Sequence, residues 1–256
     1  MLTFSSAELS AWLAAFLWPF ARVLGLLISA PLFGNPRFPL RMRLGLALLI
    51  TVVVTPTLPP VPQVAPDSLA GLGIFAQQLL IGLTMGFAVR LVFTAVEMAG
   101  ELIGMQMGLG FAMFYDPQNA GQMPVVGQFL GVLTTLIFLA LNGHLLMLSA
   151  LAESFRDLPV GTLPGTGRWL DIAGWGAGIF SAALLLAMPV IATLLTVNLA
   201  LAALTRSSPQ LNVFAIGFPI TLAVGFAALL LTLPWLPATA ESLLRVAMER
   251  LFSLGR

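Results

Sequence analysis

The stretch GMQMGLGFAMFYDPQNAG, Gly104–Gly121, lies between two long apolar segments of the chain and differs from both. Its glycines argue against one rigid helix, because a glycine inside a helix costs about 1 kcal/mol relative to alanine. Asp116 followed by Pro117 predicts a turn near its end. The strip is too apolar for a solvated loop and too rich in glycine for a plain membrane span. Its flexible and aromatic apolar side chains come from Met105, Met107, Phe111, Met113 and Phe114.

The residues alone leave two interpretations of this strip open. In the first, it is a loop tucked against the helices of its own bundle. In the second, it is a deformable plug that closes a passage and later moves aside. Methionine adapts its shape to whatever it contacts, and a hydrophobic constriction blocks water and ions without specific chemistry. The second interpretation predicts a gate.

The composition of the whole chain indicates a membrane protein with several spans. Of its 256 residues, 59% are hydrophobic and 8% are charged, and the mean hydropathy is +1.02. Soluble domains carry about 25% charged residues, so this chain cannot cover itself with an ordinary polar surface. The net charge of +1 argues against a nucleic-acid-binding surface.

We expect neither catalysis nor a bound cofactor. The chain has no cysteine and a single histidine, His144, which leaves too few ligands for a zinc site. It contains no HExxH, GxSxG or Walker sequence. The N-terminal segment lacks a basic region ahead of its apolar run, so we expect a retained helix there rather than a cleavable signal.

Apolar segments of unequal length predict an all-α membrane protein with about six kinked helices. Leu44–Leu58 would span only about 22 Å, short of a hydrocarbon core of about 30 Å. Ile172–Thr205 would reach about 50 Å, with Pro189 near its middle. We therefore expect bent or broken helices, some of them packed on other protein chains. The six segments are Leu9–Phe33, Leu44–Leu58, Leu69–Met98, Val125–Ala152, Ile172–Thr205 and Leu211–Leu236.

Residues 238–256 predict an amphipathic helix at a membrane surface or a partner interface. Glu241, Arg245 and Glu249 recur every four residues and share one helix face, while leucine, methionine and phenylalanine fall on the other. The arginines divide almost evenly between the two sides of the membrane, so the positive-inside rule leaves the topology open.

Glycines at four-residue spacing favour close packing between helices, because a missing side chain lets two backbones approach. Outside the mixed-charge loop at Glu153–Trp169, four groups show this spacing: Gly82/Gly86, Gly100/Gly104/Gly108, Gly127/Gly131 and Gly174/Gly178.

Charges in apolar surroundings suggest a second function class. Arg22, Arg90, Glu97 and Glu101 lie within apolar segments, and the two glutamates share one helix face with Arg90 two turns earlier. A proton or cation relay of an ion-coupled secondary transporter is one hypothesis, although we find no convincing internal repeat. Interface or lumen-facing charges are the favoured alternative. For His144 we favour a hydrogen-bonded packing role over proton transfer, since no carboxylate is near it in sequence.

Six runs spread along almost the whole chain carry a resemblance to a known family. They are WPFARVLGLLISAP (Trp18–Pro31), RMRLGLALLITVVVTP (Arg41–Pro56), QQLLIGLTMGF (Gln77–Phe87), GELIGMQMGLGFAMFYDP (Gly100–Pro117), LNGHLLML (Leu141–Leu148) and LTVNLALAALTRSSPQLNVFAIGFPITLAVG (Leu195–Gly225). Together they resemble the FliR family of flagellar biosynthetic proteins, which are subunits of the type III export gate.

The resemblance implies a fold, a location and partners. Residues 1–171 would be FliP-like, residues 172–236 a FliQ-like helical hairpin, and residues 237–256 the amphipathic helix. The chain would pack with FliP and FliQ relatives in a helical hetero-oligomer of the bacterial inner membrane, at the flagellar basal body. An FlhB-type gate protein, membrane lipid and unfolded export substrates would be its other partners. The injectisome branch of the family is the alternative, and the match through PQLNVF and IGFP favours the flagellar one.

The resemblance also implies a site. In the family, the loop that matches Gln106–Gln122 plugs the central channel of the gate. This sequence departs from the family's loop at Met113 and Tyr115. Carried over to this chain, the plug and gating residues are Met105, Gln106, Met107, Gly108, Gly110, Phe111, Met113, Phe114, Tyr115, Asp116 and Pro117.

Overall fold

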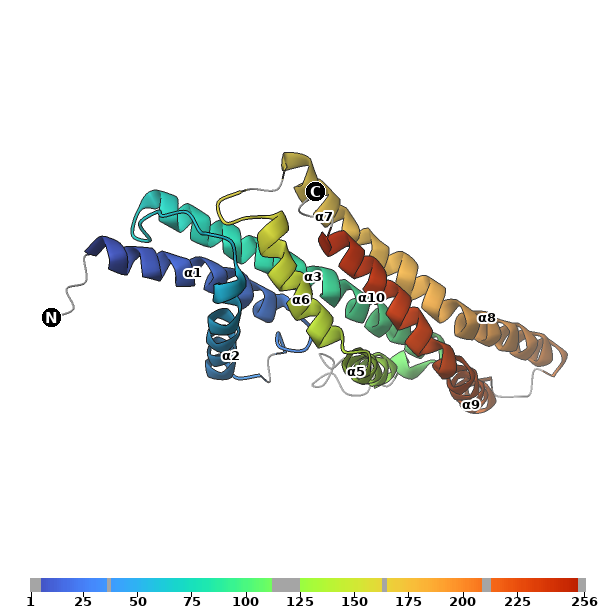
Figure 1. Ribbon diagram of the computed structural model, residues 1–256. Coiled ribbons are helices and arrows are strands. Elements are labelled where there is room, and N and C mark those ends of the chain that lie inside the picture. The colour runs from blue at the N-terminus through green and yellow to red at the C-terminus, as the bar shows by residue number, and fades with distance from the viewer. Residues whose placement is uncertain (1–5, 36–37, 112–124, 163–164, 209–212, 253–256) are drawn as a thin grey trace. The chain divides into compact units, whose positions relative to one another are not determined.

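The computed structural model describes residues 6–35, 38–111, 125–162, 165–208 and 213–252, and every regular element within these ranges is helical (Figure 1). Five helical stretches are long and apolar enough to cross a membrane, or six if α5 and α6 count as one span. The predicted all-α membrane protein is confirmed. The helices are α1 (Ser6–Ser29), α2 (Leu40–Val54), α3 (Leu69–Gln106), α5 (Val125–Ala140), α6 (Gly143–Asp157), α7 (Thr166–Trp175), α8 (Ala177–Ser207), α9 (Val213–Thr232) and α10 (Leu236–Phe252), with 3₁₀ turns η1 (Thr55–Thr57), η2 (Leu109–Phe111) and η4 (Leu233–Trp235).

Several predicted segment boundaries were wrong. The short segment that began at Leu44 begins at Leu40, and with η1 it gives a span of 18 residues, Leu40–Thr57. The segment Val125–Ala152 is two helices, because Asn142 adopts a left-handed conformation (φ 54°) that ends one helix before the next begins. The segment that ended at Met98 continues as α3 to Gln106. The length of an apolar segment alone does not predict the residue at which a helix begins, breaks or ends.

The chain forms two compact units. Unit 1 consists of Met1–Leu91, Asn142–Trp175 and Leu244–Arg256, and unit 2 consists of Val92–Leu141 and Gly176–Leu243. Helix α3 supplies residues to both.

A glycine seam joins α1 to α3 within unit 1. A Cβ added at Gly82 of α3 would lie 2.0 Å from the carbonyl oxygen of Arg22 in α1, and one added at Gly25 of α1 would lie 2.4 Å from the carbonyl oxygen of Leu79. Two backbones in direct contact leave no room for a side chain at either glycine. The four-residue spacing Gly82/Gly86 therefore marks a real helix contact.

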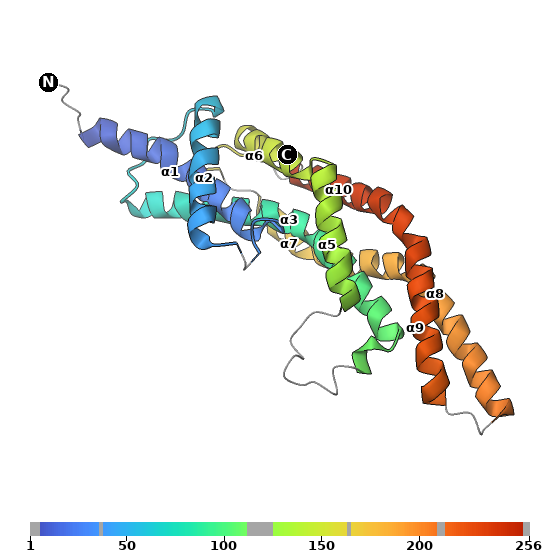
Figure 2. The same cartoon turned by 90° about the horizontal axis from the view of Figure 1, so that it is seen from below.

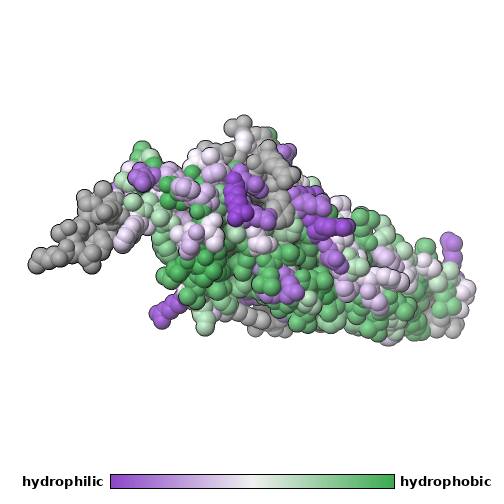
Figure 3. Space-filling model, viewed as in Figure 1, coloured by the Kyte–Doolittle hydropathy of each residue, from purple (hydrophilic) through white to green (hydrophobic). Residues whose placement is uncertain are grey.

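Helices α8 and α9 of unit 2 lie side by side as a hairpin (Figure 2). Much of this hairpin is exposed and apolar. In the most apolar stretch of each of the two candidate spans, Trp169–Ser207 and Ile216–Arg250, 22% of the residues are buried. Leu185 and Leu199 of α8 and Leu231 of α9 are each more than 70% exposed. Apolar side chains cover a large part of the visible surface (Figure 3). Such a surface requires lipid or partner chains to cover it.

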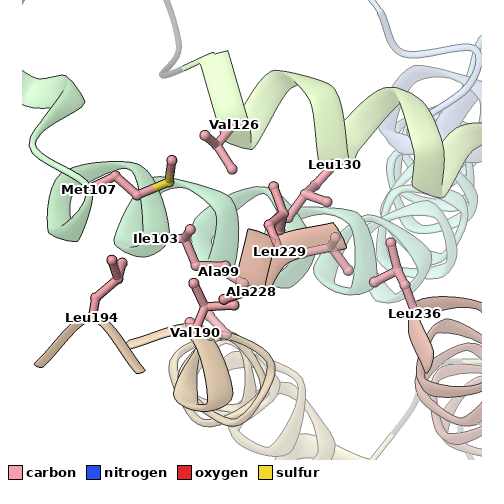
Figure 4. Close-up of a cluster of buried hydrophobic side chains, with 13 residues drawn as sticks. Ala99, Ile103, Met107, Val126, Leu130, Val190, Leu194, Ala228, Leu229 and Leu236 are labelled. Carbon is pink, nitrogen blue, oxygen red and sulfur yellow. The ribbon is translucent and has the colours of Figure 1, made fainter. Parts of the chain in front are cut away.

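The core of unit 2 combines α3, α5, α8, α9 and the start of α10 (Figure 4). Its α8 side is a helical stripe of small and branched residues, formed by Ala183, Ala187, Val190 and Leu194, all fully buried. Helices α3 and α5 meet at a second seam, where a Cβ at Gly100 would lie 2.6 Å from the Gly127 Cα. By contrast, a Cβ at Gly174 would meet nothing within 4 Å, so the spacing Gly174/Gly178 does not mark a contact at Gly174.

Candidate functional site

The glycine-rich strip begins inside α3. Met105 and Gln106 are the last two residues of that helix, and the chain continues through Gly108 into the 3₁₀ turn Leu109–Phe111. Glycine content thus did not prevent helix at residues 104–106. The second half of the predicted plug lies outside the described residues: Met113, Phe114, Tyr115, Asp116 and Pro117.

Met107 directly follows the last residue of α3, and its side chain is fully buried in the core of unit 2 (Figure 4). Its backbone N–H donates to the carbonyl oxygen of Ile103 at 2.9 Å, so the helical hydrogen bonding reaches this residue. Its side chain lies on the backbone of Gly225 in α9, where an added Cβ would be 2.5 Å from the Met107 Cγ. The Thr221 hydroxyl, one turn earlier on α9, lies 3.4 Å from the Met107 carbonyl oxygen.

The residues on either side of Met107 have different surroundings. Gly108 adopts φ +86°, a left-handed conformation that glycine takes without strain. Its N–H donates to the Met105 carbonyl oxygen at 3.0 Å. Met105 itself is 60% exposed, Gln106 is half-buried, and a Cβ at Gly110 would meet nothing within 4 Å. Within the described part of the strip, Met107 is fully buried and Leu109 packs, partly buried, against the same core, whereas Met105 is exposed.

The far end of the strip returns to the same core. Helix α5 begins at Val125, and Val126 is buried against α3. A Cβ at Gly104 would make ordinary contact with the Val126 Cγ2 at 3.7 Å. Residues 112–124 are thus bracketed by two buried residues of one core, Met107 before them and Val126 after them.

The predicted pair of glutamates shares one face of α3, the face that packs on α5. A Cβ at Gly131 would lie 2.9 Å from the Glu97 Oε1, and one at Gly127 would lie 3.2 Å from the Glu101 Cγ. Both glutamates are half-buried, whereas Arg90 is exposed. Glutamate stems therefore line the glycine seam. Within the described ranges, no group of three or more His, Cys, Asp or Glu side chains could hold a metal ion.

Arg22 is fully buried in unit 1, and its hydrogen bonds to the described residues all go to neutral acceptors. The Nε donates to the Gln78 Oε1 at 2.8 Å, and the Nη2 donates to the Leu158 carbonyl oxygen at 2.8 Å. The Nη1 donates to the carbonyl oxygen of Ser154 at 2.8 Å and to its hydroxyl at 3.1 Å. The guanidinium also lies 4.0 Å from the centre of the Phe155 ring. Arg22 therefore joins α1, α3 and the C-terminal turn of α6.

His144 is the second residue of α6 and is half-buried. Its Nδ1 is buried without a hydrogen-bond partner among the described residues. The predicted hydrogen-bonded packing role is therefore not met at this nitrogen.

Sequence reasoning missed the partners that fix these side chains. Gly225 and Thr221 receive Met107, yet Gly225 has no glycine four residues away and so shows no spacing signal. The partners of Arg22 lie 56, 132 and 136 positions away in sequence, beyond the reach of any local pattern.

Comparisons with known protein sequences show the family of this chain. The family described as bacterial export proteins, family 1, matches residues 13–247. The chain belongs to this family. Flagellar biosynthetic protein FliR of Pectobacterium carotovorum subsp. carotovorum is 47% identical over 95% of this chain and 93% of that protein. FliR of Escherichia coli (strain K12) is 42% identical over the same shares.

A relative of lower identity also matches almost the whole chain. FliR of Bacillus subtilis (strain 168) is 34% identical over 94% of this chain and 91% of that protein. The predicted FliR resemblance is confirmed, and this member of the export family is a membrane component of flagellar protein export.

Proposed function

We propose that the chain is a subunit of the flagellar type III export gate whose strip at residues 106–122 plugs the channel through which unfolded flagellar subunits pass. The bracketing of this strip carries the proposal. Met107 and Val126 are both buried in the core of unit 2, so a segment rich in methionine, phenylalanine and glycine is held at two fixed points. A loop with fixed ends and soft apolar side chains can seal a passage and deform without leaving it.

The partners follow from the exposed apolar surface and from the family. Helices α8 and α9 would form the FliQ-like hairpin within residues 172–236, packed with FliP and FliQ relatives and an FlhB-type gate protein in the inner membrane at the flagellar basal body. In this assembly residues 1–171 are the FliP-like part, and residues 237–256 are the amphipathic helix. In α10, Glu241, Arg245 and Glu249 are exposed, while Leu244 and Met248 are buried.

The ion-coupled transporter is less well supported by the charged side chains. The guanidinium of Arg22 donates to a glutamine side chain, a hydroxyl and two carbonyl oxygens, none of which is a titratable group that a relay could use. Glu97 and Glu101 line the seam between α3 and α5, which is a packing position. A seal made by apolar contact needs none of these groups to titrate.

Deletion of Phe111–Tyr115 tests the plug. Ion leak through the resting membrane is measured in cells that express the full set of partners. We expect a large leak with normal levels of assembled protein, because the seal is removed while Met107 and Val126 stay in place. A tight membrane with lost motility would instead make the strip an assembly or substrate-contact element, and the plug would be refuted.

A further inference from the structure

We propose that a cavity in unit 2 binds one acyl chain of a membrane lipid. The cavity lies between α3, α8 and the stretch where α9 gives way to α10, and the residues that line it all belong to this unit. The proposal does not depend on the plug, because no residue of the strip is among the described residues of the cavity wall.

The cavity reaches into the core of unit 2. Its volume is about 340 Å³, at the lower end of the range of about 300 to 1,000 Å³ for small-molecule sites. Its wall includes Pro189 inside α8 and residues of the 3₁₀ turn η4, two departures from regular α-helix. Side chains that border empty space lose dispersion contacts, so such a cavity favours an occupant. Its floor consists of buried core side chains: Val96, Ala99, Ile103, Leu130, Leu229 and Leu236 (Figure 4).

The lining selects a neutral, apolar ligand. Among the described residues that line the cavity none is charged, and the hydroxyl groups come from Thr232, Thr239 and Ser242. Each of these hydroxyls already donates to a backbone carbonyl oxygen three or four residues earlier, at 2.8 to 3.0 Å. The wall therefore presents neither a charge nor a free hydroxyl proton to a phosphate or a carboxylate. Hydrocarbon is the chemistry that matches it.

The mouth of the cavity opens on the apolar surface of the hairpin. Leu185 of α8 and Trp235 of η4 line the cavity and are 73% and 68% exposed. They belong to the candidate membrane spans Trp169–Ser207 and Ile216–Arg250. The solvent around such spans is hydrocarbon, so a cavity that opens between them fills with hydrocarbon.

An acyl chain suits this space better than a segment of a partner protein. A helix bonds its own backbone, but at about 10 to 12 Å across it is wider than a cavity whose volume equals a cube of about 7 Å. An extended segment would bring backbone N–H and C=O groups into an apolar wall, where each group without a hydrogen bond costs free energy. An acyl chain carries no such group beyond its ester. It can reach Ala99 and Ile103 while the polar head stays outside.

Photolabelling tests whether an acyl chain enters the cavity. The protein is co-expressed with its partners, and the purified complex is placed in phosphatidylethanolamine vesicles that include a phosphatidylethanolamine with a diazirine near the end of one acyl chain. After illumination, peptide mass spectrometry locates the label. We expect label on Ala99 and Ile103 of the floor as well as on Leu199 and Leu231, which are exposed on α8 and α9. Label on the exposed residues alone overturns the proposal, because lipid then covers the hairpin without entering it.

A cavity-filling variant adds a second test. Ala182→Phe places a ring in the cavity wall, and we expect label on the floor residues to fall about tenfold with label on Leu199 unchanged, because the ring takes the space of the chain. Ala192→Phe is the matched control, since Ala192 is exposed on the same helix outside the cavity wall, and it should keep the floor label. If Ala182→Phe does not assemble, Ser242→Phe makes the same test at an exposed position of the wall. Floor label that persists in the assembled variant overturns the proposal, because the label then reaches the core by another route.

Discussion

Replacing Arg22 with methionine should destabilise unit 1 more than the loss of one surface charge can. Methionine has a similar length but no donors, so the substitution removes the hydrogen bonds to Gln78, Ser154 and Leu158. The Ser154 carbonyl oxygen keeps its bond from the Leu158 N–H at 2.9 Å. The Gln78 Oε1 and the Leu158 carbonyl oxygen are left without the donor that Arg22 supplied.

The magnitude follows from these two stranded oxygens. A buried acceptor that loses its donor costs about 1 to 3 kcal/mol, so two cost about 2 to 6 kcal/mol. The Leu158 carbonyl oxygen lies just past the last residue of α6, where carbonyl oxygens lack helical donors, so Arg22 is the donor that satisfies it. Release of the buried charge offsets part of this cost, which places the expected value in the lower half of the range. Against a total stability of about 5 to 15 kcal/mol, this is a large fraction.

The measurement is heat-induced loss of assembled protein, followed by size-exclusion chromatography of a fluorescently tagged chain co-expressed with its partners. Arg90→Met is the matched control, since Arg90 is exposed and its loss should change stability by less than about 0.5 kcal/mol. Arg22→Lys keeps the charge but presents a point donor that cannot reach both α3 and α6, so it should fall between the two. Equal heat stability of Arg22→Met and Arg90→Met would refute the reasoning.

Two further predictions concern the seam between α3 and α5. Gly100→Ala places a Cβ 2.6 Å from the Gly127 Cα, so we expect it to lower the temperature at which assembled protein is lost by the equivalent of about 1 to 3 kcal/mol. Gly73→Ala should not lower it, because a Cβ there would meet nothing within 4 Å, and equal behaviour of the two would show that the seam can part without cost. Glu97→Gln removes a charge but keeps the shape of the side chain against Gly131, so export should persist. Lost export with normal assembly would restore the relay hypothesis.

The four-residue spacing of glycines predicted part of the helix packing. It did not predict contacts between residues that are far apart in the sequence. Four-residue glycine spacing located the contacts at Gly82 and Gly100, because one absent side chain per turn is what two touching backbones require. The same spacing at Gly174 marked no contact, since an exposed helix tolerates glycine without using it. Spacing reports that a close approach is permitted, and tertiary structure decides whether one occurs.

The end of α3 shows the same division. The intrinsic cost of glycine argued against one rigid helix through Gly104–Gly121, and α3 ends within this stretch, at Gln106. Gly104 packs against Val126, and Met107 is seated on Gly225, so burial offsets a propensity cost of about 1 kcal/mol per glycine. Neither contact partner is near in sequence to the residue it holds. The strip was recognisable as unusual from its composition, but the burial of Met107 was not.

The hydrogen bonds of buried Arg22 bear on the relay hypothesis. A relay requires groups that exchange protons or ions with their neighbours, which means partners that titrate. Arg22 instead donates to oxygens that do not titrate, and its donors reach α3 and the C-terminal end of α6. Such a residue adds rigidity to its unit, because each acceptor fixes the guanidinium in one geometry. Arg22 is therefore a packing group of unit 1 rather than a member of a relay.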